Sequence, residues 1–401
     1  MKRLLLFFCI LSMLWMPLSA YAEEKSKNEQ KSEAVYQLKT DPFEVDAKSA
    51  VLMEASTGTV LFAQNAAEAL PPASVTKVMT LLLVMEALDN GNFTLTDRVS
   101  VSKNAASMGG SQVFLEEGER MTVEDLLKCT VIASANDAAL ALAEYVAGSE
   151  SAFVARMNER ASQLGLTSTH FENVTGLDDT VTRHETSAAD IAVMTKELLS
   201  HPTILNYSSL WQDTIRGGAF TLTNTNRLVR FYDGCNGMKT GSTDKAGYCV
   251  SVTATRDGMT LIAVVMGAES RDSRNAIART LLDYGFSGFG VYTSEERKIE
   301  TVPVLGGTED AVGLYCKPFS AVVGKGDVRK VEVVYDIPAT LTAPTEQGQA
   351  VGKMTFYLNG EVLGSADLYA DASVGKISFF RIFMRYIENM LTGTQSSRYS
   401  R

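Results

Sequence analysis

The sequence has few of the residues on which several common catalytic mechanisms depend. Only three histidines occur in 401 residues, and no Gly-x-Ser-x-Gly elbow is present, so a serine hydrolase with a histidine base is disfavoured. His-Glu-x-x-His, the P-loop and Gly-x-Gly-x-x-Gly are also absent. These motifs mark zinc peptidases, nucleotide hydrolases and dinucleotide-binding enzymes. We therefore expect neither a metal ion nor an organic cofactor.

Basic charge is also scarce. The chain has 37 Lys and Arg against 47 Asp and Glu, which gives a formal net charge of -10. Phosphate binding requires concentrated Lys and Arg, so we expect no nucleic acid partner. A hydrophobic content of 45% and a charged content of 21% are typical of a globular protein. The length allows two domains, each with its own core.

The five cysteines indicate neither a disulfide framework nor a metal site. Cys9 lies in the apolar N-terminal stretch, and the others, Cys129, Cys235, Cys249 and Cys316, are irregularly spaced. An exported protein could form a disulfide, and Cys235 with Cys249 is the nearest pair. The favoured interpretation is that these are buried free thiols, with the pairing of Cys235 and Cys249 left open.

The N-terminus has the pattern of a secretory signal peptide. Lys2 and Arg3 precede an apolar run, and small residues surround Ala22, so we predict a signal peptide over residues 1–22 and an exported protein. An uncleaved membrane anchor is the alternative, although the run is short for a span. Residues 23–41 are polar and charged, which favours a flexible leader.

Residues 42–290 combine strand and helix patterns. Two apolar runs flank Gly58, and two others flank Asp257-Gly258, so two β-hairpins are predicted. Helices are predicted between and after them. They cover 74–88, 122–132, 137–146, 152–164, 187–199 and 272–284. Strands at both ends with helices between them favour an antiparallel sheet that carries helices on its faces.

The sequence pattern changes after residue 290. Residues 291–373 form short alternating runs separated by turns, which predicts a small all-β domain. Residues 374–401 follow, and within them apolar residues recur at steps of three and four from Ile377 to Leu391, opposite a face that contains Arg381 and Arg385. Such a helix suits a membrane interface with anionic lipid. Docking on its own domain is the alternative.

Three short motifs carry the functional argument. Ser-x-x-Lys and Ser-x-Asn each occur four times and are weak alone, whereas Lys-Thr-Gly occurs once, at Lys239. Context separates the copies. Ser74 follows two prolines at the start of an apolar helix, and Lys77 lies one turn later on the same face. Ser100 and Ser373 lack that setting.

Each motif also has a plainer interpretation. Ser74 could cap its helix, and Ser134 or Asn136, in the loop "IASAND", could cap the next one. The stretch "GMKTGSTDKAGY" could be an ordinary turn that enters a strand. The order of the three motifs favours function over these alternatives. Ser134 follows Ser74 by 60 residues, and Lys239 follows Ser134 by 105.

With these motifs the chain resembles the penicillin-recognising serine enzymes, and most closely the low-molecular-mass D-alanyl-D-alanine carboxypeptidases of peptidase family S11. "HFENVTGL" and "HETSAADIAVM" add to the resemblance, as do the β-rich region and the terminal helix. The resemblance implies an α/β (α+β) penicillin-binding/serine β-lactamase-like transpeptidase domain with an antiparallel sheet. A small all-β domain and a C-terminal amphipathic helix would follow it.

The resemblance also implies roles for individual residues. Ser74 would be the acyl-ester nucleophile, Lys77 the general base, Ser134 the proton relay to the leaving amine, and Asn136 the residue that holds Lys77 and the substrate. The substrate-binding set would be Lys239, Thr240, Gly241 and Ser242, with Arg274 or Arg227 as a second cation. The backbone N–H groups of Ser74 and Ser242 would donate to the oxyanion. Several relatives have His, Thr or Phe where this chain has Ser242, so specificity is expected to differ, while activity is expected to survive because the donor is backbone.

The implied substrate is the D-Ala-D-Ala end of a peptidoglycan stem peptide, with β-lactams as inhibitors. The protein would act at the extracytoplasmic face of the cell membrane, bound peripherally through its C-terminal helix. Alternatives are a D,D-endopeptidase, a β-lactamase, or a non-catalytic wall-binding or penicillin-sensing module. The Glu-x-x-Leu-Asn element of class A β-lactamases is absent, which disfavours the β-lactamase.

Overall fold

The computed structural model describes residues 34–40, 43–179, 181–296, 298–381, 383, 384 and 387. The predicted signal peptide, residues 1–22, lies outside them. The chain divides into two compact units, Lys39–Val291 and a second unit that combines Met1–Leu38 with Tyr292–Arg401. The domain boundaries at 41/42 and 290/291 stay a proposal from the sequence.

A five-stranded sheet forms the centre of the first unit. Its strand order is β2-β1-β9-β8-β7, and neighbouring strands are antiparallel. The strands are β1 (Ser49–Glu54), β2 (Val60–Gln64), β7 (Cys235–Thr243), β8 (Gly247–Arg256) and β9 (Met259–Ala268). Both predicted hairpins are confirmed: Gly58 turns β1 into β2, and Asp257-Gly258 joins β8 to β9.

The two residues of the second hairpin turn both have positive φ, 49° at Asp257 and 78° at Gly258. This is the conformation that two-residue turns between twisted strands require.

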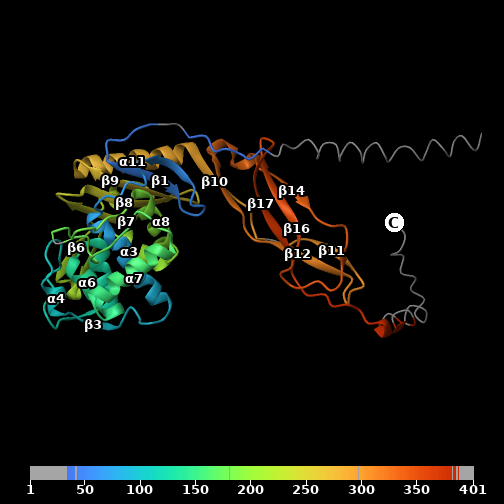
Figure 1. Cartoon of the computed structure of the whole chain (residues 1–401), viewed down its shortest axis with the longest axis horizontal. Coiled ribbons are helices and arrows are strands. Elements are labelled where there is room, and N and C mark those ends of the chain that lie inside the picture. The colour runs from blue at the N-terminus through green and yellow to red at the C-terminus, as the bar shows by residue number, and fades with distance from the viewer. Residues whose placement is uncertain are drawn as a thin grey trace, which may run out of the picture. The chain divides into compact units, whose positions relative to one another are not determined.

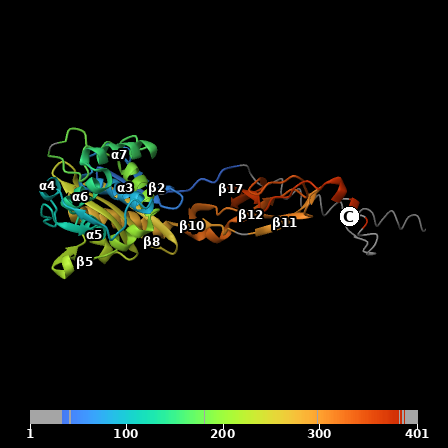
Figure 2. The same cartoon turned by 90° about the horizontal axis from the view of Figure 1, so that it is seen from below.

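Helices cover both faces of this sheet. Helix α11 (Arg271–Gly288) packs on one face, and α8 (Ala188–Leu199) and α3 (Lys77–Asp89) lie on the other (Figure 1). Further helices pack around α3: α5 (Val123–Ile132), α6 (Asn136–Ala147) and α7 (Glu150–Gln163). Figure 2 shows α6 and α7 beside α3. The predicted fold class, an antiparallel sheet with helices, is therefore confirmed.

Shorter elements complete the first unit. They are η1 (Ala73–Thr76), β3 (Arg98–Ser100), α4 (Lys103–Ala106), β4 (Arg120–Thr122), η2 (Pro202–Ile204), α9 (Leu205–Ser208), β5 (Gln212–Ile215), η3 (Arg216–Gly218), β6 (Phe220–Thr223) and α10 (Leu228–Phe231). The β3–β4 and β5–β6 pairs form two separate two-stranded sheets. The predicted helices agree with the structure to within a few residues at most ends. Several begin at side-chain caps, such as the Thr122 hydroxyl, which accepts the N–H of Asp125 at 3.0 Å.

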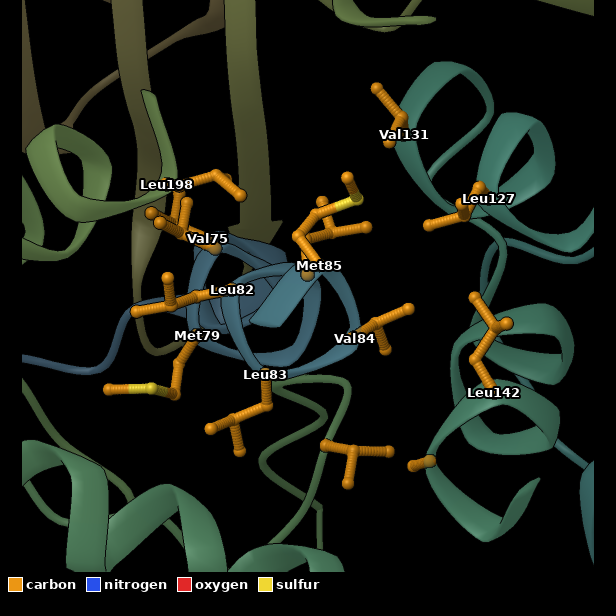
Figure 3. Close-up of a cluster of buried hydrophobic side chains, with 14 of the residues drawn as sticks. Val75, Met79, Leu82, Leu83, Val84, Met85, Leu127, Val131, Leu142 and Leu198 are labelled. Carbon is orange, nitrogen blue, oxygen red and sulfur yellow. The ribbon is translucent and has the colours of Figure 1, made fainter. Parts of the chain in front are cut away.

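Helix α3 is enclosed on nearly all sides. Ten of its residues are buried, from Lys77 to Ala87. Figure 3 looks along the helix and shows apolar side chains projecting in several directions, toward Leu127 and Val131 of α5, Leu142 of α6 and Leu198 of α8. A helix that is apolar all round belongs in a core. Because the short turn η1, which contains Ser74, leads directly into this helix, the core fixes the position of the Ser74 hydroxyl.

The second unit is built on strands. Its six-stranded sheet has the order β14-β16-β17-β12-β11-β15, with β11 (Lys298–Leu305), β12 (Ala311–Cys316), β14 (Glu332–Asp336), β15 (Leu341–Thr342), β16 (Ala350–Leu358) and β17 (Glu361–Ala370). β10 (Phe289–Thr293) pairs with β13 (Ser320–Gly324), and η4 (Lys325–Lys330) follows. The prediction of an all-β unit is confirmed, since among the residues described between 298 and 370 the only helical element is one 3-10 segment.

The structure describes only part of the two segments predicted at the ends of the chain, the polar leader and the C-terminal amphipathic helix. The leader was expected to be flexible, yet at its described end Tyr36 donates its N–H to the carbonyl of Val362 at 2.8 Å. Within the predicted amphipathic helix, 379–381, 383, 384 and 387 are helical, and the rest of it after 387 lies outside the described residues. Within the part of the chain that can be described, no helix is long and apolar enough to cross a membrane.

The four cysteines after the apolar N-terminal stretch are buried free thiols, and they lie at positions 129, 235, 249 and 316. The favoured interpretation is confirmed, and Cys235 is not paired with Cys249. Burial raises the pKa of both of these thiols to about 11. They are therefore inert packing groups at neutral pH.

Candidate active site

Ser74 lies in a tight turn rather than in the α-helix itself. The helix expected from residue 74 starts as the 3-10 turn η1 and becomes the α-helix α3 only at Lys77. Side chains three residues apart eclipse one another in a 3-10 turn. The turn therefore places the Ser74 hydroxyl beside the Lys77 amine. Ser74 is not the N-cap of this segment, because that position is Pro72 and no side chain caps it.

Lys77 is buried with three oxygen partners. Its Nζ lies 2.9 Å from Ser74 Oγ, 2.6 Å from Asn136 Oδ1 and 3.0 Å from the carbonyl oxygen of Thr175. The side chain is fully inaccessible to solvent. A buried amine with this set of acceptors is held in one orientation, with the serine oxygen as one of its neighbours.

The surroundings of Lys77 favour its neutral form. Burial is the main cause and lowers the pKa of Lys77 well below its ordinary value, and the positive charge of Lys239 lowers it further. The carboxylate of Asp137 opposes both effects. A lysine that loses its proton readily can accept the proton of a neighbouring hydroxyl.

Ser134 and Asn136 come from the junction between α5 and α6. Ser134 has φ of 62°, an uncommon conformation for a residue with a side chain, and Ala135 is the N-cap of α6. Neither Ser134 nor Asn136 caps the helix, so the plainer interpretation is wrong here. The Asn136 amide accepts from Lys77 through Oδ1 and donates to the carbonyl of Gly109 through Nδ2 at 2.7 Å.

Lys239 joins the third motif to the second. It lies on β7, the last strand of the sheet, and its Nζ donates to Ser134 Oγ at 2.8 Å and to the carbonyl of Thr240 at 3.0 Å. Burial lowers the pKa of Lys239 to about 7, and the nearby charge of Arg274 contributes. The hydroxyl of Thr240 donates to that of Thr225 at 2.8 Å.

Two glycines allow the backbone segments to meet around Ser74. A Cβ on Gly241 would lie 2.7 Å from the Ser74 nitrogen, and one on Gly176 would lie 1.8 Å from the Ala73 oxygen. Real Cβ atoms do not approach so closely. Strand β7 and the 173–177 segment therefore contact the turn through bare backbone, and only glycine fits at either position.

The remaining predicted residues differ in placement. Arg274 is buried at the start of α11, where it donates weakly to the carbonyl of Cys249 at 3.4 Å, and burial lowers its pKa to about 10. Its charge acts on Lys239. Arg227 is exposed at the N-cap of α10 and has no ion pair with any residue the structure describes. Ser242 is exposed on β7, next to Gly241.

Several contributors could not be identified from the sequence. The Thr175 carbonyl receives a hydrogen bond from Lys77, and the Gly109 carbonyl receives one from Asn136. Backbone acceptors leave no signature in residue type. Thr225 contacts Thr240, and Asp137 is fully buried, where its carboxylate accepts the N–H groups of Val113 and Leu115. The position of Asp137 directly after Asn136 was the available clue.

The assembled groups can perform acyl transfer. The Ser74 hydroxyl lies beside the amine of Lys77, which favours its neutral form. The Ser134 hydroxyl is hydrogen-bonded to the buried Lys239, and the backbone of β7 packs against the turn that contains Ser74. No cluster of three or more His, Cys, Asp or Glu that could hold a metal occurs among the residues described. Fold and site together fit a serine hydrolase, the class of enzyme that performs acyl transfer through a hydroxyl.

Comparison with known proteins identifies the family. Residues 35–270 match the peptidase S11 family, described as D-alanyl-D-alanine carboxypeptidase, and residues 291–376 match the C-terminal domain of penicillin-binding protein 5. D-alanyl-D-alanine carboxypeptidase DacF of Bacillus subtilis (strain 168) is 41% identical over 394 residues, which cover 96% of this chain and 98% of that protein. The chain belongs to the peptidase S11 family of D-alanyl-D-alanine carboxypeptidases.

Solved structures agree. Penicillin-binding protein 5 from Haemophilus influenzae is 32% identical with a TM-score of 0.75, covering 84% of this chain and all of that one. Penicillin-binding protein D2 from Listeria monocytogenes, in its ampicillin-bound form, is 31% identical with a TM-score of 0.57 and covers 62% of this chain and all of that one. The penicillin-binding fold of this chain is thus shown by its sequence and by its structure.

Proposed function

We propose that the protein is a serine-type carboxypeptidase that removes the terminal D-alanine from peptidoglycan stem peptides through an acyl-enzyme on Ser74. One observation carries the proposal: the Ser74 hydroxyl lies 2.9 Å from a buried amine, that of Lys77, whose pKa is lowered by burial. Membership of the S11 family supports the substrate class.

In the first step the neutral amine of Lys77 takes the hydroxyl proton of Ser74. The oxygen then attacks the carbonyl carbon of the penultimate D-alanine. An ester bond forms, the peptide C–N bond breaks, and the proton that Lys77 took passes through Ser134 to the leaving nitrogen. D-Alanine departs, and water hydrolyses the ester in a second step. General acid–base catalysis of this kind contributes roughly 10² to 10⁴ in rate.

Binding is assigned to the Lys239 region. Lys239 and Thr240 bind the terminal carboxylate, and Arg274 increases the positive potential from its buried position beside them. Arg227 is less suited to act as the second cation because it is exposed and makes none of the hydrogen bonds described for Lys77 and Lys239. The backbone N–H groups of Ser74 and Ser242 donate to the oxyanion, and the close approach of Gly241 to Ser74 brings these two segments together.

β-Lactams acylate the same serine in this proposal. The related penicillin-binding protein D2 from Listeria monocytogenes has been solved in ampicillin-bound and cefotaxime-bound forms. A β-lactam carbonyl placed at Ser74 would meet the same base and the same donors as the peptide. The ester it forms is expected to hydrolyse slowly.

The first experiment measures D-alanine release from a peptide that ends in D-Ala-D-Ala. Wild type is expected to release D-alanine, whereas Ser74→Ala is expected to reduce the rate by at least about 10³-fold, since the covalent step is lost. Ser100→Ala is the matched control. Ser100 also begins a Ser-x-x-Lys copy but lies in β3, so its variant should retain full activity.

Two outcomes would contradict the proposal. Release that persists in Ser74→Ala would exclude the nucleophile. No release by folded wild type, combined with cleavage of cross-linked dimers, would replace the carboxypeptidase with an endopeptidase. Labelled penicillin serves as a second readout, because it is expected to modify wild type and Ser100→Ala but not Ser74→Ala.

We further propose export and peripheral attachment of the C-terminal segment to a membrane surface. Phe379, Phe380, Phe383 and Met384 are 84%, 71%, 54% and 46% exposed. Such a concentration of exposed apolar side chains is uncommon on a soluble surface and suits the boundary of a lipid bilayer.

Vesicle sedimentation tests the attachment. The full chain is expected to sediment with anionic phospholipid vesicles, and the double variant Phe379→Ser/Phe380→Ser is expected to lose most of this binding. Phe231→Ser is the control, because Phe231 is 59% exposed but belongs to the other unit. Equal binding by the wild type and the double variant would exclude the proposed surface.

A further inference from the structure

A chain of hydrogen bonds ends at the peptide group that precedes the nucleophile. The Oγ1 of Thr76 donates to the carbonyl oxygen of Ala73 at 2.8 Å, and the same Oγ1 lies 2.8 Å from Nε2 of His184. The Nδ1 of His184 accepts the N–H of Glu172 at 3.1 Å. The proposed carboxypeptidase mechanism assigns no role to Thr76 or His184.

The donor and the acceptor of each of these hydrogen bonds follow from the bond between Glu172 and His184. Because Nδ1 of His184 accepts the N–H of Glu172, it carries no proton, and the neutral ring then has its proton on Nε2. That N–H donates to Thr76 Oγ1, which leaves the hydroxyl proton free to donate to Ala73. Every bond therefore points toward the Ala73 carbonyl.

The Ala73 carbonyl belongs to the same planar peptide unit as the Ser74 N–H. In a trans peptide the carbonyl and the N–H point in opposite directions, so fixing one fixes the other. A hydrogen bond to the carbonyl also polarises the unit and makes its N–H a stronger donor. These hydrogen bonds therefore act on the Ser74 N–H, which is the group that donates to the oxyanion in the proposed function.

The packing around this peptide is tight. Ala73 has a positive φ of 47°, a conformation that costs about 1 kcal/mol for a residue with a side chain. A Cβ on Gly176 would collide with the Ala73 carbonyl and would lie 2.7 Å from Thr76 Oγ1. His184 is 6% exposed and meets the ring of Phe171 edge-on. The strained peptide is thus held by a hydroxyl, a buried imidazole and a bare stretch of backbone.

We propose that Thr76 and His184 are positioning residues that hold and polarise the Ala73–Ser74 peptide, so that its N–H is preorganised for the oxyanion. The inference rests on the proposed function, because it assigns the Ser74 N–H to the oxyanion of that reaction. An oxyanion forms only in the transition state, so losing this alignment lowers kcat and leaves KM nearly unchanged.

The test compares three threonine variants in the full chain. Thr76→Val removes the hydroxyl at constant shape and is expected to lower kcat for D-alanine release about 10- to 100-fold, with KM within about twofold of wild type. Thr76→Ser keeps the hydroxyl and is expected to restore kcat to within about threefold. Thr80→Val is the matched control: it removes a 2.7 Å bond of the same kind, from buried Thr80 of α3 to the carbonyl of Val174.

Acylation by labelled penicillin is a second readout that does not depend on the peptide substrate. Thr76→Val should slow the acylation of Ser74 by a similar factor, with Thr80→Val near wild type. His184→Phe keeps a ring in the pocket but removes the N–H, and it is expected to lower kcat by about three- to tenfold. This variant also keeps the proposal testable if Thr76→Val does not fold.

Three results would overturn the proposal. They are equal losses in Thr76→Val and Thr80→Val, a change confined to KM, and a Thr76→Ser variant as impaired as Thr76→Val. Failure of the proposed function gives a different result. In that case folded wild type itself releases no D-alanine, while penicillin acylation still reports on the Ser74 peptide.

Discussion

In the unit built on the five-stranded sheet, three cationic side chains are almost wholly removed from solvent: Lys77, Lys239 and Arg274. In the unit built on the six-stranded sheet, the core is made of apolar side chains such as Leu314, Phe356 and Leu368. Among the residues described in that unit, Thr345 is the only buried polar side chain.

The contrast separates groups that stabilise a fold from groups that serve a reaction. Burying apolar side chains is favourable, whereas burying a cation costs several kcal/mol unless it is neutralised or paired. Lys77 and Lys239 have hydroxyl, amide and carbonyl partners rather than carboxylates. Their lowered pKa values are the consequence of this arrangement. The first unit thus gives up some stability to hold the buried amine that we propose as the base, whereas the described part of the second unit buries no cationic side chain.

The largest expected effect comes from removing the buried base. Lys77→Met keeps an unbranched side chain but removes the amine, and we expect kcat/KM for D-alanine release to fall by at least about 10³-fold. Lys330→Met is the control, because Lys330 of the second unit is exposed and pairs with Asp327 at 2.7 Å. Activity of Lys77→Met within tenfold of wild type would exclude the lysine as base.

A second prediction concerns stability and pH. The pKa of Lys239 is about 7 in the folded protein against an ordinary 10.5, so between these values the unfolded chain binds more protons. The contribution of Lys239 to stability therefore decreases as the pH falls from 10.5 to 7. The free energy of unfolding of wild type should fall relative to Lys239→Met by up to about 5 kcal/mol over this range, measured by urea denaturation. A constant difference would show that the buried amine is not destabilising.

A third prediction examines the apolar core. Leu314 is fully buried in the six-stranded sheet, and Leu314→Ala is expected to destabilise the second unit by about 2–5 kcal/mol. The apolar cores of the two units are separate. Under conditions too mild to unfold the second unit of the variant, acylation of Ser74 by labelled penicillin should therefore keep its wild-type rate. Ala311→Gly, at an exposed position of the same strand, is the control. Slower acylation in Leu314→Ala would show that the units are energetically coupled.

The smallest expected effect is at acid pH. Burial lowers the pKa of His184 to about 4, against the opposing charge of Glu172 and Asp178 and with a small contribution from His170. Between pH 6.5 and 4 the unfolded chain binds the extra proton, so His184 should reduce stability by up to about 3 kcal/mol as the pH falls through this window. Acid unfolding of His184→Phe should lack this component. His201→Phe, which removes a histidine paired with Asp89 at 2.5 Å, is the comparison.

Much of the fold could be predicted because it depends on neighbours in the sequence. Asp257-Gly258 has the two residues that a tight hairpin turn requires, and Thr122 has the hydroxyl that caps α5. These interactions join residues a few positions apart. The apolar stretch after Ser74 likewise indicated a buried helix, although its first turn is 3-10 and α-helical geometry begins only at Lys77.

The site was predictable as a set of residues but not as an arrangement. Motif order pointed to Ser74, Lys77, Ser134, Asn136 and Lys239. The structure joins them by hydrogen bonds in two groups, Lys77 with Ser74 and Asn136, and Lys239 with Ser134. Choosing between Arg274 and Arg227 as the second cation required knowing which guanidinium is buried beside Lys239. Sequence spacing cannot distinguish two arginines on different elements.

The sequence by itself pointed to the side chains that we propose as reacting groups, and it determined the turns, most helix starts and the change from a mixed unit to an all-β unit. Only the tertiary structure decided that a carbonyl at Thr175 receives the amine of Lys77, 98 residues away, and that Gly176 lies against the peptide before Ser74. The physical reason is that local structure follows from each residue's neighbours. A lowered pKa or a preorganised peptide, in contrast, depends on burial and on contacts between segments that meet only in the folded chain.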